Sequence, residues 1–104
     1  MRAPSLAPVP TMDQQALTGR LRQALLAFET ARRVFMRAQG RLKGLPMEKV
    51  AADWRGPGQG IEQRMRSAAA AVVIAHRTCL VAGLSADAKD QHIIAEARRH
   101  FEGG

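Results

Sequence analysis

The sequence predicts an all-α protein, a small antiparallel bundle of three main helices and one short helix, with a long first helix. Apolar residues recur at helical spacing over long segments, and proline and glycine interrupt this spacing at only a few points. No segment shows the alternating pattern of a β-strand. We therefore expect one helical-bundle domain over residues 13–102, preceded by a disordered extension over residues 1–12 that contains three prolines.

The long first helix is expected from Thr11 to about Lys43, a span without proline. Thr11 followed three residues later by Gln14 is the pattern of a capping box. Two apolar rows then repeat every seven residues, one of large and one of small side chains. The rows are Leu21, Phe28, Phe35 and Leu42, and Leu17, Ala24, Ala31 and Ala38. We expect Phe28 and Phe35 to be core residues, beside alanines that allow a second helix to approach closely.

Glycine and proline set the bounds of the remaining elements. These elements are a short helix over residues 46–54, a turn-rich connector over 55–60, a third helix from about Gly60 or Ile61 to Ala82 and a last helix over 86–101. Gly44 and Gly83 are expected to end the first and third helices, because glycine adopts the left-handed conformation of a helix end. Ser85 is expected to cap the last helix.

The third helix is apolar on nearly all sides, which is typical of a central helix or of one at an interface. One side carries the stripe from Ile61 to Cys79, and the opposite side carries Ala70, Ile74 and Val81. The last helix is too short to match the first. We therefore expect Ala70, Ile74 and Val81 to contact a second copy, as a homodimer, or a helical partner protein.

Positive charge is concentrated in the first half of the chain, since residues 1–43 carry +6 of the net charge of +7. Four arginines are predicted on the exposed side of the first helix, namely Arg22, Arg33, Arg37 and Arg41. Leu26 and Val34 are predicted among them. Such a face favours an acidic protein or a nucleic acid, while an arginine-biased genome would leave it simply solvated. Few aromatic residues argue against base stacking on single strands.

No catalytic, cofactor or metal-binding pattern stands out. The single cysteine, Cys79, excludes an intramolecular disulfide and a four-cysteine zinc site. His92, Glu96 and His100 share a helix face, but three ligands along a straight helix span about 12 Å, too far for one ion. The glycines of residues 56–60 follow no strand and precede no GK[ST] sequence. We expect a non-enzyme without cofactor, metal or small-molecule substrate.

The turn between the third and last helices, Gly83–Ser85, is similar to that of helix-turn-helix DNA-binding proteins. In that motif the recognition helix packs through apolar side chains at positions held here by Lys89 and His92. The sequence therefore favours an ordinary corner between two helices, ended by a glycine cap.

The most apolar stretch, residues 67–84, holds His76 and Arg77 at its middle, where charge is costly in a bilayer. Residues 1–12 lack the apolar segment of a secretory signal. We therefore expect a cytoplasmic bacterial protein without a membrane partner. The function that the sequence favours is a small helical interaction protein, a regulator or accessory subunit that binds a protein partner or itself. The alternative is a nucleic-acid-binding accessory protein that uses the basic face of the first helix.

Overall fold

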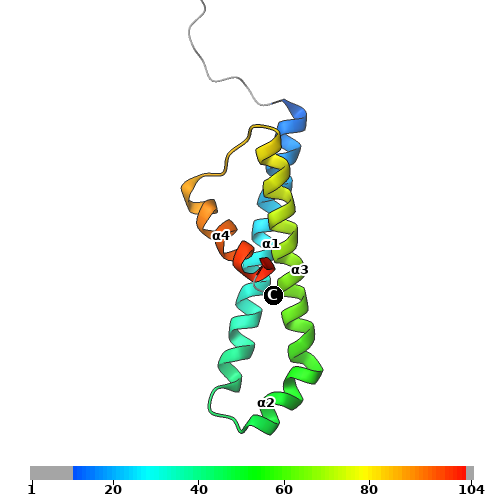
Figure 1. Cartoon of the computed structure of the whole chain (residues 1–104), viewed down its shortest axis with the longest axis vertical. Helices are drawn as coiled ribbons and strands as arrows, with labels where there is room; N and C mark the ends of the chain where they lie inside the picture. Colours follow the sequence, from blue (N-terminus) through cyan, green and yellow to red (C-terminus); the bar gives the residue numbers. More distant parts are fainter. Residues whose placement is uncertain (1–10, 103–104) are drawn as a thin grey trace, which may run out of the picture.

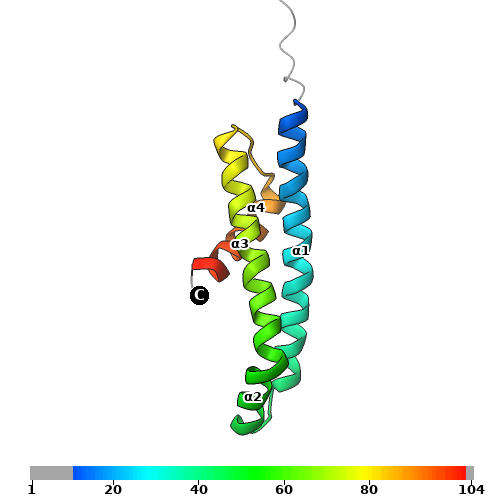
Figure 2. The ribbon, with the colours of Figure 1, turned by 90° about the vertical axis from the view of Figure 1, so that its right-hand side faces the viewer.

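The computed structural model describes residues 11–102, and this range contains four α-helices and no β-strand. The elements are α1 (Met12–Leu42), α2 (Met47–Asp53), a π-helical turn (Trp54–Gly58), α3 (Gln59–Val81) and α4 (Ala88–Glu102). α1 and α3 lie side by side in opposite directions, with α2 at their connected end (Figure 1). α4 crosses this pair on one side and covers only part of its length (Figure 2). The predicted all-α bundle with a long first helix is confirmed.

The capping box at the start of α1 is present as predicted. The Gln14 amide donates to Thr11 Oγ1 at 3.1 Å, and the Thr11 amide donates to Gln14 Oε1 at 2.9 Å. These two bonds satisfy backbone groups that have no partner inside the helix. The helix begins at Met12, which is the last residue of the expected extension. Residues 1–10, where the rest of that extension was expected, lie outside the described residues.

Two glycines end helices in the left-handed conformation, as the sequence predicts. Gly44 has φ +80° after α1, and Gly83 has φ +79° after α3. At the second site the Gly83 amide donates to the Leu80 carbonyl at 3.0 Å, and the Leu84 amide donates to the Cys79 carbonyl at 2.8 Å. This pair of bonds is a Schellman motif, which satisfies the last carbonyls of α3 while the chain turns toward α4.

The connector between α2 and α3 is tighter than the sequence predicts. Only Gly56, with φ −106° and ψ −117°, leaves helical geometry, and Gln59 and Gly60 already belong to α3. Glycine permits this single-residue kink because it has no Cβ to restrict its backbone. At Gly58 the chain passes close to Asp53, since an added Cβ would lie 2.8 Å from Asp53 Oδ2.

The predicted cap of the last helix is wrong. α4 begins at Ala88, and Asp87, not Ser85, provides the cap. Its Oδ1 accepts from the Asp90 amide at 2.8 Å, and its carbonyl accepts from the Gln91 amide at 2.9 Å. Aspartate caps helices as well as serine does, and its negative charge also interacts favourably with the helix dipole. The helix therefore begins three residues after Ser85, and residues 84–87 belong to no helix.

The core lies where α4 crosses the α1–α3 pair. It consists of Leu21, Leu25 and Phe28 from α1, Met65, Ala69, Val72 and Cys79 from α3, and Ile94 and Ala97 from α4. Phe28 is fully buried, which confirms its predicted place, whereas Phe35 is only partly buried. The reason is position, because Phe35 lies two turns further along α1, toward the end that α4 leaves uncovered.

Within residues 11–102 we find no helix that combines the length and the apolar character required to cross a bilayer.

Candidate interaction surfaces

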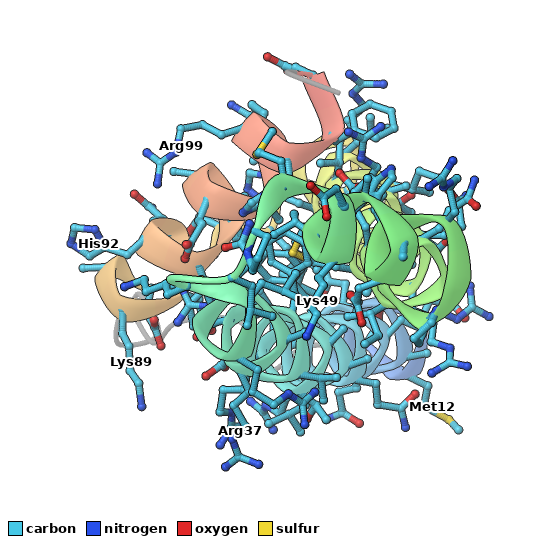
Figure 3. All side chains as sticks on the ribbon, turned by 90° about the horizontal axis from the view of Figure 1, so that it is seen from below. Met12, Arg37, Lys49, Lys89, His92 and Arg99 are labelled. Atoms are coloured by element: carbon cyan, nitrogen blue, oxygen red, sulfur yellow. The ribbon has the colours of Figure 1, made fainter. Side chains whose placement is uncertain are left out.

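The arginine surface of α1 consists of Arg22, Arg33, Arg37 and Arg41, and all four side chains are exposed. Arg37 points away from the body of the protein (Figure 3). Within the described residues none of the four forms an ion pair, and Arg33 Nε donates only to the Glu29 carbonyl of its own helix, at 3.4 Å. At 100° per residue, Arg22 and Arg41 point about 100° apart, so the four follow a spiral along α1.

Arg32 differs from these four because it faces α4. Its Nη1 donates to Glu96 Oε2, which joins α1 to α4 through a partly exposed ion pair. The Phe28 and His100 rings meet nearby, with centroids 6.0 Å apart and planes tilted by 56°. Arg32 is therefore engaged within the fold, while the arginine surface remains available to solvent.

The apolar set predicted on the far side of α3 is the outer α3 surface, made of Ala70, Ile74 and Val81. Ala70 is half-buried, whereas Ile74 is 60% exposed and Val81 90% exposed. Within the described residues no other helix covers Val81, and α1 borders Ile74 without burying it. Exposed β-branched side chains on one helix face are a feature of surfaces that become buried on binding.

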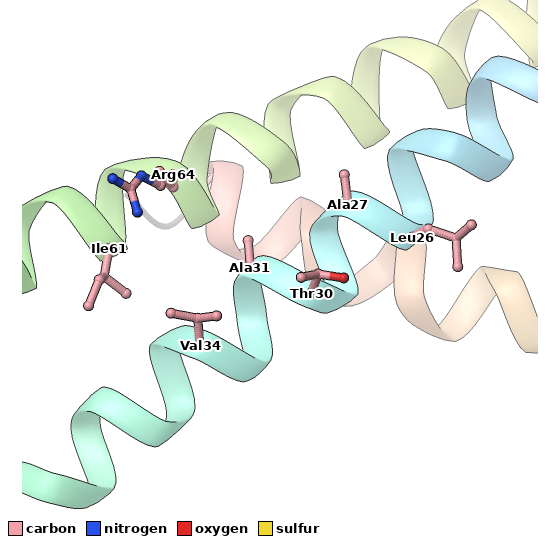
Figure 4. Close-up of a pocket in the computed structure, with 7 residues that line it drawn as sticks. All are labelled: Leu26, Ala27, Thr30, Ala31, Val34, Ile61 and Arg64. Atoms are coloured by element: carbon pink, nitrogen blue, oxygen red, sulfur yellow. The ribbon is translucent and has the colours of Figure 1, made fainter.

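A groove runs between α1 and α3 and is built entirely from these two helices. One cavity in it, of about 450 Å³, is lined by Leu26, Ala27, Thr30, Ala31, Val34, Ile61 and Arg64. Val34 and Ile61 point into this space from opposite helices (Figure 4). A second cavity, of about 370 Å³, is lined by Leu17, Arg20, Ala24, Ala71, Ile74, Ala75 and Thr78.

The two cavities follow each other along one seam, which we call the α1–α3 groove. Residues seven apart on a helix face nearly the same way, within about 20°. Arg20, Ala27 and Val34 form such a row on α1, and Arg64, Ala71 and Thr78 form one on α3. The lining is mainly apolar and includes two threonines, Thr30 and Thr78, and two arginines. Its only charged members in the described chain are Arg20 and Arg64.

Sequence reasoning missed this groove, although it placed Leu26 and Val34 on the exposed side, where the structure has them. It treated the alanine row as a contact that allows a second helix to approach closely, and it placed no groove beside this contact. The missing signal is the row Arg20, Ala27, Val34 and Arg41, which repeats every seven residues beside that contact. A row with basic ends and an apolar middle is unlike the stripe of a helix that faces only the core.

A third apolar surface, the tip surface, lies at the connected end of the α1–α3 pair, on α2 and the π-helical turn. A shallow hollow of about 350 Å³ is lined by Met47, Val50, Ala51, Trp54 and Arg55. Met47 and Trp54 are exposed. This tip surface is shorter than the groove, because α2 has only seven residues.

Cys79 is buried in the core, where its Sγ lies 3.5 Å from the Leu17 carbonyl oxygen. Burial raises the pKa of the Cys79 thiol, the opposite of what activates a nucleophilic cysteine. Burial, followed by the charge of Arg98, lowers the pKa of His76, whose Nδ1 lacks a hydrogen-bond partner in the described chain.

The three potential ligands on α4 do not converge. Glu96 pairs with Arg32, His100 lies against Phe28, and the exposed His92 points outward (Figure 3). Within residues 11–102 no cluster of three or more His, Cys, Asp or Glu side chains has the arrangement of a metal site.

The corner after α3 also differs from a DNA-reading helix-turn-helix. Lys89 and His92 are both exposed and point away from the body of the protein (Figure 3), so α4 does not pack through these positions. It packs instead through Ile94 and Ala97, which are buried.

Comparison of the chain with known protein families, with curated protein sequences and with solved structures finds no match in any of the three.

Proposed function

We infer that this chain is a small non-enzymatic interaction protein that presents its helices to a protein partner or to a second copy of itself. The observation that carries this inference is the exposure of large apolar side chains on the two long helices, above all Ile74 and Val81. Burying such a side chain contributes roughly 1.5–3 kcal/mol each. A protein surface that covers them would therefore be strongly favoured over water.

The arrangement of the helices in residues 11–102 supports this function, because it leaves apolar surfaces uncovered within the described residues. α4 covers only one side of the α1–α3 pair, so the opposite side keeps an apolar groove and the outer α3 surface keeps Ile74 and Val81 exposed. Helical bundles usually bury such stripes against another helix. A partner helix would complete the bundle.

The test uses a double variant, Ile74→Ser with Val81→Ser, and a matched control, Met36→Ser. All three side chains are exposed, so neither variant removes a core contact. Self-association is measured by sedimentation velocity, and partner capture by pull-down from the native host after nuclease treatment. We expect the wild type and the control to show a dimer or a retained protein, and the double variant to lose it. A wild type that stays monomeric and retains nothing would contradict the inference.

A second candidate is nucleic-acid binding by the arginine surface, favoured by the exposure of all four of its arginines. Replacing Arg22, Arg33, Arg37 and Arg41 with Ala would then weaken binding to every sequence alike. The salt dependence of binding would become less steep by up to about four units, one for each lost phosphate contact. If these arginines serve an acidic protein, the same variant would mainly slow association with that protein. Either way, folding stability should change by less than about 0.5 kcal/mol, because the side chains are exposed.

A further inference from the structure

We propose that the α1–α3 groove binds one acidic amphipathic helix of a partner protein. This assignment rests on the proposed function, and it adds the site and the chemistry of the partner. The groove shares Ile74 with the outer α3 surface, but Val81 lies outside both of its cavities, and the groove continues along α1 through Ala27 and Val34.

The dimensions of the groove fit a single helix. Its lining extends along α1 from Leu17 to Val34, which at 1.5 Å per residue is about 26 Å, the length of a helix of about 18 residues. Small side chains from both helices form much of this lining, namely Ala24, Ala27, Ala31, Ala71 and Ala75. Because small side chains let helix axes approach closely, a third helix can lie in the groove, in contact with both α1 and α3.

Apolar side chains stand at the edges of the groove where a docked helix would contact them. On α1, Leu26 is 59% exposed and Val34 43% exposed. On α3, Ile74 is 60% exposed and lines the second cavity. A stripe of apolar residues at helical spacing on the partner would cover these three side chains together.

The charge of the groove selects an acidic partner. The charged residues that line it are Arg20 and Arg64, one in each cavity and on opposite helices, and Arg41 extends the row of Arg20 along α1. No Asp or Glu in the described chain lines either cavity. A helix with carboxylates beside its apolar stripe would pair with both lining arginines, and such charge-assisted hydrogen bonds are strong.

The same charges disfavour the two other occupants. A second copy in the same groove would bring like-charged arginines together in a chain of net charge +7, which opposes association. A nucleic acid would place phosphates over an apolar lining that offers hydrogen-bond donors mainly at the two arginines.

The experiment selects ligands from a display library of 18-residue helical peptides against the full chain. Each peptide carries a fixed apolar stripe, and the positions beside the stripe are randomised among Glu, Gln and Lys. We expect selection to enrich Glu at these positions, and the affinity of a selected peptide to fall as salt screens its charges.

Variants locate the binding site by calorimetry with the selected peptide. Ala27→Phe fills the groove, and Arg20→Glu or Arg64→Glu reverses its charge. Each should weaken binding by at least about tenfold, because Ala27→Phe fills space that the bound helix needs and each charge reversal replaces an attraction with a repulsion. The controls are Ala95→Phe and Arg99→Glu, which make the same changes on exposed positions of α4, and they should leave affinity unchanged.

Four results would overturn the proposal: enrichment of Lys or Gln, no enriched peptide at all, equal binding by Ala27→Phe, or a dimer of this chain that Ala27→Phe dissociates. The first three results would leave the proposed interaction function standing. That function fails only if the wild type does not self-associate and retains no host protein in the pull-down after nuclease treatment.

Discussion

Arg32 of α1 and Glu96 of α4 form an ion pair that joins residues 64 positions apart in the sequence. It is the link between α4 and α1 that does not depend on apolar contact. Both side chains are partly exposed, so water weakens their attraction. The pair therefore links α4 to α1 but contributes little to the stability of the fold.

A double-mutant cycle with Arg32→Ala and Glu96→Ala should give a coupling energy of about 0.2–1 kcal/mol, typical of a partly exposed pair. Amide hydrogen exchange in α4 should become faster in either single variant, since α4 loses one of its attachments to α1. Arg33→Ala is the matched control, because Arg33 contacts only its own helix. Equal exchange rates in α4 for wild type and Arg32→Ala would contradict this role.

Phe28→Ala should destabilise the protein by about 3–5 kcal/mol, because a fully buried phenylalanine leaves a large cavity. Phe35→Ala should cost clearly less, since Phe35 is only partly buried beyond the reach of α4. Urea denaturation followed by circular dichroism measures both values. Equal losses for the two variants would mean that the part of α1 around Phe35 is covered in solution, as a second copy of the chain would cover it.

The sequence was sufficient to predict the helices because their signals are local. The capping box at Thr11 and the left-handed glycines 44 and 83 depend on neighbours within a few residues, and the structure has them as predicted. The cap at Asp87 was missed because Ser85 and Asp87 both suit a cap, and only the packing of α4 decides between them.

The candidate site was less predictable because it depends on the crossing of helices. Helical periodicity indicated Ile74 and Val81 as apolar residues opposite the main stripe of α3, but which side of α3 the last helix covers depends on how α4 crosses it. The groove likewise requires Val34 and Ile61 to face each other from two helices. The exposed arginines were predictable, since helical periodicity alone separates them from Phe28.

Gly83→Ala should destabilise the protein by about 1–2 kcal/mol, because an alanine must adopt the left-handed conformation there. Gly40→Ala is the matched change within α1, where an added Cβ meets no atom within 4 Å. It should stabilise the protein by about 0.5–1 kcal/mol, the gain in helix propensity. Thermal denaturation should therefore move in opposite directions for the two variants. A Gly83→Ala variant as stable as the wild type would show that the Schellman turn after α3 is not retained in solution.

The stability of the protein should decrease as pH falls below about 6.5, and His76 should contribute to this decrease. Burial and then Arg98 lower the pKa of His76 below its usual value of 6.5 in the folded state. Below pH 6.5 the unfolded chain therefore binds a proton at this position more readily than the folded chain does. The contribution of His76 to stability is present above pH 6.5 and is lost as pH falls toward the lower, folded-state pKa.

Melting temperatures between pH 8 and pH 5 should show a smaller decrease for His76→Gln than for the wild type. Arg98→Gln should give an intermediate decrease, since it removes only the second cause. If His76→Gln retained the full wild-type pH dependence, protonation of His76 would not be coupled to unfolding.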